Sequence, residues 1–335
     1  MSPNSDEEEE FLDKLVKDIV DQFFTEFRLQ LRDLAPDDDS PTPMQSEFIP
    51  ETEKDYQEYI WRYIKRNLPR FYERGDPFVE NLVTRAAACS RQITQEYDLD
   101  RKVTPKVAIM GLYDFVILCD DSGSMKKGTR IQALADVCQR ISHIASAIHP
   151  QGVFLRFLNN QSDYPCEMMS DSEAIRAKIL STRYGGFTQL GTMLQTNITE
   201  PFIFEKYERK ELKKPIIAVV ITDGCPTKER REMFQEAVLY CKGRLTELKY
   251  EPASVIFLIS RIGDDPEAEF FLSGLRTKAL EEMLYSCPDQ LDKRRHVFRR
   301  AEKNSEYSSR LINMFATALD GQAEMPTLRP GDRSV

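Results

Sequence analysis

Long apolar runs, histidine and tryptophan are scarce in this chain of 335 residues, which has three histidines and one tryptophan. No stretch approaches the ~18 apolar residues of a bilayer-spanning helix, so we expect no membrane span. The N-terminus lacks the basic and apolar regions of a signal peptide, so we expect a protein that is not secreted. The seven cysteines form no CxxC pair, and Cys119, Cys138 and Cys241 fall on apolar faces. Buried, reduced thiols of this kind indicate the cytoplasm or the nucleus.

Positive charge is not in excess either. The chain has 46 basic and 55 acidic side chains, a net charge of -9, and residues 1–50 hold 14 of the acidic and 4 of the basic ones. The remainder is therefore close to neutral, which argues against a protein-wide surface for nucleic acid. The basic run Lys293 to Lys303 is interpreted as a solvated face; an acidic partner or the acidic N-terminus are the alternatives.

The length predicts two structural units. From Phe11 to Leu34 apolar residues recur with helical spacing, and the proline-rich stretch that follows predicts a linker. Two further helices are predicted, and Asp76 with Pro77 forms a favourable helix start. The predicted organisation starts with an acidic disordered N-terminus at 1–10 and a helical region at 11–100, with helices over 11–34, 56–71 and 77–97. An α/β domain follows at 106–320, and its pattern is clear to about 275. A flexible tail is predicted at 321–335. The helical region is either a small domain or a set of helices laid against the sheet.

Strand and helix patterns alternate after Val107. Strands are predicted at 113–119, 153–158, 216–222 and 254–262, and helices at 129–148, 172–181, 190–206, 229–249 and 266–275. This order predicts a doubly wound, mainly parallel sheet with helices on both faces. Beyond 275 we expect one more strand, for which 296–298 is a poor match, and a closing helix over 309–319.

Polar side chains follow two of these strands. Asp120, Ser122 and Ser124 come directly after the first strand, and Asp223 follows the strand at 216–222. A glycine-containing loop between them offers Thr188. Carboxylates and hydroxyls are hard oxygen ligands of the kind that suit Mg²⁺ or Mn²⁺, and the carboxyl ends of parallel strands are where open α/β sheets bind ligands. The alternative is that Asp120 and the serines only cap the helix at 129–148.

The order Asp-x-Ser-x-Ser, Thr, Asp resembles the metal-ion-dependent adhesion site of von Willebrand factor A domains, over about 106–275. The resemblance implies that Ser122 and Ser124 bind a metal ion directly, that Asp120 and Asp223 bind it directly or through water, and that Thr188 joins them. Mg²⁺ or Mn²⁺ is expected, and Ca²⁺ stays open. With only two carboxylates the ion keeps a free position, which a partner's Asp or Glu side chain can fill.

The expected function is therefore a metal-dependent, non-enzymatic protein–protein interaction. Two other functions stay open: a magnesium-dependent phosphatase or phosphotransferase, although Ser122 stands where such enzymes carry a second aspartate, and a scaffold whose N-terminal helices recognise the partner. Asp121 is expected to be solvent-exposed, and Thr222 to satisfy local backbone groups. The acidic residues 6–10 could also occupy the chain's own metal site, which we state as a hypothesis.

Overall fold

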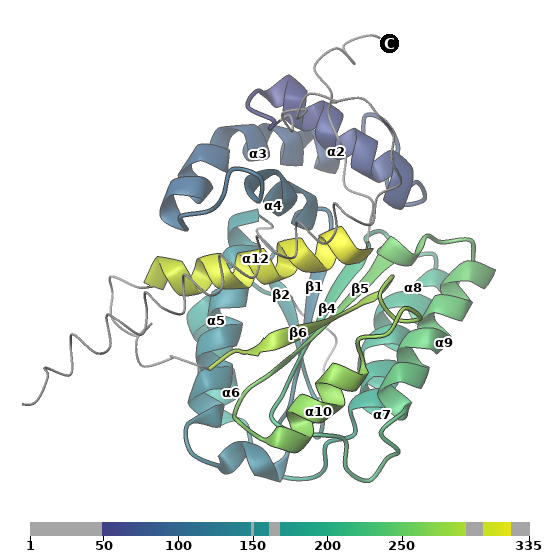
Figure 1. Ribbon diagram of the computed structural model, residues 1–335. Helices are drawn as coiled ribbons and strands as arrows, with labels where there is room; N and C mark the ends of the chain where they lie inside the picture. Colours follow the sequence, from purple (N-terminus) through teal and green to yellow (C-terminus); the bar gives the residue numbers. More distant parts are fainter. Residues whose placement is uncertain (1–48, 149–150, 161–167, 293–303, 323–335) are drawn as a thin grey trace, which may run out of the picture. The chain divides into compact units, whose positions relative to one another are not determined.

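The computed structural model describes residues 49–148, 151–160, 168–292 and 304–322 (Figure 1). Contacts divide the chain into two compact units, Met1–Ser46 and Glu47–Val335, and all described residues belong to the second. Its centre is a six-stranded sheet in the order β3-β2-β1-β4-β5-β6, parallel except where β2 meets β3. The strands are β1 (Asp114–Cys119), β2 (Val153–Phe157), β3 (Met168–Met169), β4 (Ile216–Thr222), β5 (Val255–Arg261) and β6 (Leu284–Gln290). The predicted α/β class with a mostly parallel sheet is confirmed.

The central strands are mostly apolar because both faces of the sheet are covered. Alternate residues of a strand point to opposite faces. Phe115 and Ile117 of β1 accordingly join one apolar cluster, and Val116 and Leu118 join the other. Burial on both faces explains why these strands are continuous apolar runs, without the alternation of a half-exposed strand.

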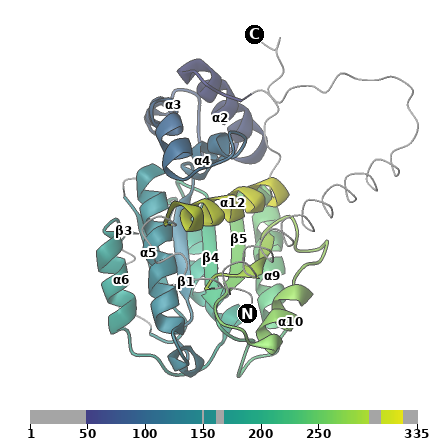
Figure 2. The same cartoon turned by 60° about the vertical axis from the view of Figure 1, so that its left-hand side comes forward.

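The helices form a layer on each face of the sheet (Figures 1 and 2). One cluster contains side chains of α5, α6 and α12, and the other contains side chains of α7, α9 and α10. The helices are α2 (Glu53–Asn67), α3 (Pro77–Glu96), α4 (Thr104–Met110), α5 (Arg130–Ile148), α6 (Ser172–Ser181), α7 (Leu190–Leu194), α8 (Glu205–Glu208), α9 (Met233–Glu247), α10 (Pro266–Gly274) and α12 (Asn304–Gln322). None of the helices in these described ranges combines the length and apolarity that a bilayer crossing demands.

Two predicted elements need correction, and two elements of the structure were not predicted. The helix expected over 190–206 is split into α7, a π-helical segment Gln195–Phe204 and α8. Pro201 lies inside the π-helical segment, and a proline removes a backbone donor and disturbs the normal ladder. α4 and the two-residue β3 were not predicted. The strand expected beyond 275 is β6, whose mixed composition around Pro288 hides it; the weak match at 296–298 lies outside the described residues.

The helices predicted at 56–71 and 77–97 are present as α2 and α3, and Asp76 accepts a hydrogen bond from the backbone of Phe78 at the start of α3. They share one apolar cluster with the sheet. The hydroxyls of Tyr63 in α2 and Tyr113 before β1 lie 2.6 Å apart, and that of Tyr113 donates to the carbonyl of Ala253 at 3.0 Å. The helix predicted over 11–34 and the acidic residues 6–10 lie outside the described residues.

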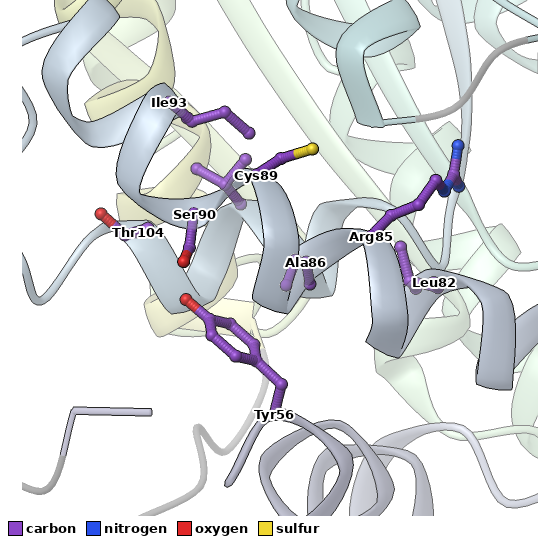
Figure 3. A pocket seen from close by; sticks show the side chains of 10 residues that line it. Tyr56, Leu82, Arg85, Ala86, Cys89, Ser90, Ile93 and Thr104 are labelled. Atoms are coloured by element: carbon purple, nitrogen blue, oxygen red, sulfur yellow. The ribbon is translucent and has the colours of Figure 1, made fainter. Parts of the chain in front are cut away.

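A small cavity of about 30 Å³ lies among α2, α3 and α4 (Figure 3). Its lining includes Tyr56, Cys89, Ser90 and Thr104. This volume has room for a water molecule and not for a substrate. The cavity lies beside α2, which contacts the chain just before β1 through Tyr63 and Tyr113. β1 spans 6 residues, so its carboxyl end lies roughly 20 Å from that contact.

Candidate metal centre

The sheet register places the two predicted carboxylates next to each other. β1 and β4 are parallel neighbours with Cys119 opposite Ile221. The backbone N–H of Asp120 donates to the carbonyl of Ile221 at 2.9 Å, which continues the pairing one residue past β1. Asp120 and Asp223 therefore leave two adjacent strands at the same edge, and both are fully buried.

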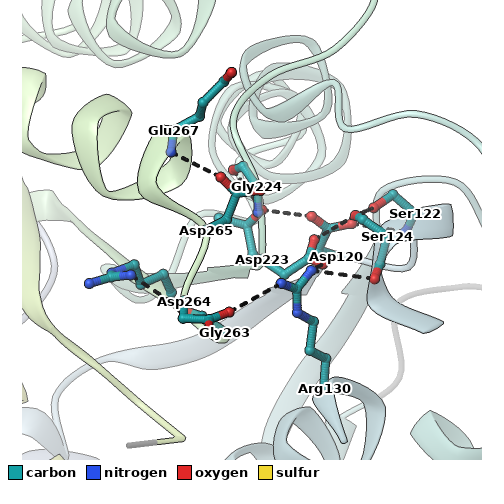
Figure 4. Close-up of polar contacts among 12 residues, drawn as sticks. Asp120, Ser122, Ser124, Arg130, Asp223, Gly224, Gly263, Asp264, Asp265 and Glu267 are labelled. Carbon is teal, nitrogen blue, oxygen red and sulfur yellow. Dashed lines mark hydrogen bonds and ion pairs between the residues drawn. The ribbon is translucent and has the colours of Figure 1, made fainter. Parts of the chain in front are cut away.

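Hydrogen bonds connect the serines to these carboxylates (Figure 4). The Ser122 N–H donates to Asp120 Oδ1 at 2.8 Å, and the Ser124 hydroxyl donates to Asp223 Oδ1 at 2.7 Å. The two serine hydroxyls lie 3.0 Å apart. Four of the five predicted site residues thus form one connected cluster of oxygens.

Burial and a second carboxylate affect the titration of Asp120. Burial, and then the negative charge of Asp223, raise the pKa of Asp120 to about 6, while hydrogen bonds from Ser122 and Thr222 act in the opposite direction. The Thr222 hydroxyl donates to Asp120 Oδ2 at 2.6 Å and also lies 3.3 Å from the Gly224 N–H. Thr222 therefore contacts local backbone as predicted and in addition orients Asp120. Two buried like charges are unfavourable together unless a positive charge lies nearby.

Capping of the helix at 129–148 does not explain these residues. α5 begins at Arg130, ten positions after Asp120. The oxygens of Asp120 accept from Ser122 and Thr222, and the hydroxyl of Ser124 donates to a carboxylate; none of these contacts involves the first turn of α5.

Asp121 is buried, so the prediction of an exposed carboxylate was wrong. Its Oδ1 accepts from the Asn159 N–H at 2.8 Å and from the Asn159 side chain at 3.0 Å. Its Oδ2 accepts from the Asn160 N–H at 2.9 Å and also from the Asn160 side chain. The donors come from the turn after β2, so the sequence next to Asp121 held no signal for this role.

The same asparagines hold the loop that carries Thr188. Asn159 exchanges hydrogen bonds with both backbone groups of Phe187, at 2.9 and 3.0 Å. Thr188 is tied in from the other side at the backbone, since its N–H donates to the Thr227 hydroxyl at 2.8 Å and its carbonyl accepts from the Thr227 N–H at 2.9 Å. The loop of the fifth predicted residue is thus anchored to the turn after β2 and to the loop after β4.

Arg130 is a charged neighbour that the sequence analysis missed. Its Nη1 lies 2.5 Å from Asp223 Oδ2 and 3.5 Å from the carbonyl of Ser124 (Figure 4). Its Nη2 lies 3.8 Å from Asp264, on the segment after β5. An arginine at the start of a helix has no local pattern that predicts such a partner 93 positions away in the sequence.

Exposed basic and aromatic side chains lie next to the cluster, together with the exposed carboxylate of Asp264. Lys126, Lys127 and Lys228 are exposed on the loops that follow β1 and β4. Phe187 is 49% exposed, and the Lys228 ammonium lies 5.4 Å from the centre of its ring. Basic, aromatic and acidic side chains therefore together form the border of the cluster.

Comparison with known proteins adds no relative. A scan against protein-family models found no match to this chain, and a search of the curated proteins found none either.

Proposed function

We propose that this chain is a metal-dependent protein-binding module of the von Willebrand factor A type, in which Mg²⁺ or Mn²⁺ links the chain to an acidic side chain of a partner. The observation that carries the proposal is the cluster of Asp120, Ser122, Ser124 and Asp223 on two adjacent strand ends. A mostly parallel sheet with apolar clusters on both faces agrees with the doubly wound fold that the resemblance implies.

The donor chemistry fits a hard divalent ion. The cluster offers carboxylate and hydroxyl oxygens, which Mg²⁺ and Mn²⁺ prefer over softer ligands. Within the described part of the chain there is no group of three or more His, Cys, Asp or Glu side chains able to hold a metal. An ion at this edge would therefore be held by the hydroxyls of Ser122 and Ser124 as well as by the two carboxylates, with Thr188 as a further donor from its anchored loop.

The charge balance supports an acidic partner. Two carboxylates only neutralise a divalent ion, and the hydroxyls add no charge, so the ion would remain attractive to a further carboxylate. Exposed lysines at 126, 127 and 228 would favour other acidic groups of that partner, and Phe187 would contact its apolar side chains. Such a border contributes to orientation and association rate more than to affinity.

The hydrogen bonds of Asp121 argue against a catalytic acid at this position. A phosphatase that used Asp120 would need a further carboxyl group as an acid, besides the carboxylates proposed to hold the ion. Asp121 is fully buried, and both of its oxygens accept hydrogen bonds from Asn159 and Asn160. It is therefore not available to donate a proton to a leaving group.

Calorimetric titration of Mg²⁺ and Mn²⁺ tests the ion site. We expect one ion per chain in the wild type and none in the Asp120→Ala/Asp223→Ala variant. Glu211→Ala removes an exposed carboxylate elsewhere and should bind like the wild type. Circular dichroism would confirm that each variant is folded. Equal binding by the wild type and the double variant would place the ion elsewhere.

A peptide selection then tests the partner chemistry. Random peptides displayed on phage would be selected on the immobilised protein with Mg²⁺ and eluted with EDTA. We expect the eluted peptides to be enriched in Asp and Glu. Binders that lack acidic residues, or that stay bound in EDTA, would contradict a metal-bridged carboxylate.

A further inference from the structure

Arg130 already contacts the carboxylate that the proposed ion requires. Its guanidinium pairs with Asp223 Oδ2 at 2.5 Å, while Oδ1 of the same carboxylate accepts from Ser124. The Arg130 side chain is 11% exposed and Asp223 is 0% exposed, so water screens this pair weakly.

Gly263 provides the space in which this side chain lies. A Cβ at position 263 would come within 2.6 Å of Arg130 Nε, and the backbone there has a φ of +82°, which favours glycine. The Gly263 N–H donates to Asp292 at 2.9 Å, which fixes the turn after β5. The fold therefore leaves a defined place for the guanidinium between the ends of β4 and β5.

A second carboxylate, that of Asp264, lies on the solvent-exposed side of the Arg130 guanidinium. Asp264 Oδ1 is 3.8 Å from Arg130 Nη2, and the Asp264 side chain is 93% exposed. Asp223 and Asp264 are therefore both carboxylate partners of the same guanidinium, the first buried and the second exposed (Figure 4).

A divalent ion and the guanidinium would carry like charges at one carboxylate. Their repulsion is strong at a few ångströms in a poorly screened environment, so the two cations compete for Asp223. We infer that Arg130 is a built-in competitor of the divalent ion: it pairs with Asp223 in the ion-free protein, moves toward Asp264 when the ion binds, and so sets the ion affinity. This inference rests on the proposed metal site.

Titration of Mg²⁺ alone into the full chain, at about 150 mM salt, tests the inference. Removing the competing charge in Arg130→Gln should raise the Mg²⁺ affinity by about tenfold. Lys65→Gln is the matched control, because it removes an exposed positive charge from α2, which meets the opposite end of β1. Its affinity should stay within about twofold of the wild type, since water and salt screen an exposed charge.

Two further readouts separate competition from a purely structural role. Asp264→Asn removes the outer acceptor, so it should weaken Mg²⁺ binding by about threefold, opposite in sign to Arg130→Gln. In EDTA, Arg130→Gln should melt below the wild type, because its two buried carboxylates lose their cation. Mg²⁺ should then raise the melting temperature of Arg130→Gln by more than it raises that of the wild type.

The outcomes distinguish the inference from the proposed function. If the wild type binds Mg²⁺ and Arg130→Gln binds it equally or more weakly, the inference is wrong and the proposed function stands. If neither binds Mg²⁺ or Mn²⁺, the proposed function fails and the inference fails with it. Should Arg130→Gln not fold, Asp264→Asn decides, because unchanged affinity in that variant contradicts the outward movement.

Discussion

At the scale of single residues, the polar side chains next to the candidate metal centre divide into those that face the cluster and those that support it. Asp120 and Asp223 supply the charge, while Asp121 points away to Asn159 and Asn160. Adjacent aspartates therefore have different roles because the strand end turns one side chain toward β4 and the other toward β2. The supporting contacts fix the loop of Thr188 through hydrogen bonds between protein groups alone.

The backbone conformation of that loop requires a glycine at position 186. Its φ is +89°, and a Cβ there would lie 2.2 Å from Asn159 Oδ1. Gly186→Ala should lower the free energy of unfolding by about 2 kcal/mol and weaken Mg²⁺ binding, because both the backbone strain and the displaced asparagine disturb the loop.

Gly185→Ala is the matched control for this prediction. A Cβ at Gly185 would meet nothing within 4 Å, and its N–H would still donate to the carbonyl of Asp121. Urea denaturation of both variants gives the comparison. Equal stability of the two would show that the loop does not need the conformation at Gly186.

At the scale of secondary-structure elements, the short α7 lies unusually close to α9. Gly191 in α7 would place a Cβ 2.3 Å from the backbone carbon of Met233, and Glu229 accepts hydrogen bonds from the N–H groups of Gly191 and Thr192. The carboxylate of Glu229 thereby satisfies backbone donors at the start of α7. This contact directly follows the Thr188 loop and holds it against the elements after β4.

Gly191→Ala should therefore be more costly than a helical glycine-to-alanine change normally is. The new methyl group meets backbone, which cannot rotate away, so we expect a loss of about 1–3 kcal/mol of unfolding free energy. Gly243→Ala in α9 faces open space and should stabilise the protein by about 0.5–1 kcal/mol through helix propensity. Thermal and urea denaturation of the pair would show opposite signs; a shared stabilisation would mean that α7 and α9 can move apart freely.

At the scale of the whole second unit, α2, α3 and the sheet share one apolar core. Their apolar side chains belong to a single cluster, and the Tyr63–Tyr113 contact links α2 to β1. Deleting residues 1–100 would remove α2 and α3 from this core. The deletion would therefore destabilise the sheet and its helices, and not only remove a recognition surface. A scaffold role of the N-terminus is better tested by deleting 1–46, the other compact unit.

The single tryptophan, Trp61, offers a direct test of whether α2, α3 and the sheet unfold together. It lies in α2 and packs against the shared cluster. In urea, the loss of Trp61 fluorescence and the loss of far-ultraviolet circular dichroism should share one midpoint, since two-state unfolding makes different probes coincide. An earlier fluorescence transition would show that α2 and α3 detach as a separate unit.

Local pattern alone predicted the elements with strong periodicity and the residues that follow them. Apolar runs marked β1, β2, β4 and β5, because these strands are buried on both faces, and residue order placed Asp120 and Asp223 at two strand ends. Pattern failed where composition is mixed, as in β6, or where a proline changes the helical ladder, as at Pro201.

The partners that these residues contact could not be read from local pattern and follow from the folded arrangement. Ser124 and Asp223 are 99 positions apart, and Arg130 and Asp223 are 93 apart, yet both pairs are in contact. The parallel register of β1 and β4 creates these contacts, and register is a property of the assembled sheet. Residue order alone was therefore enough to predict which carboxylates and hydroxyls lie at the strand ends. The fold decided that Asp121 is buried, that the Thr188 loop is anchored, and that an arginine pairs with the carboxylate proposed to hold the ion.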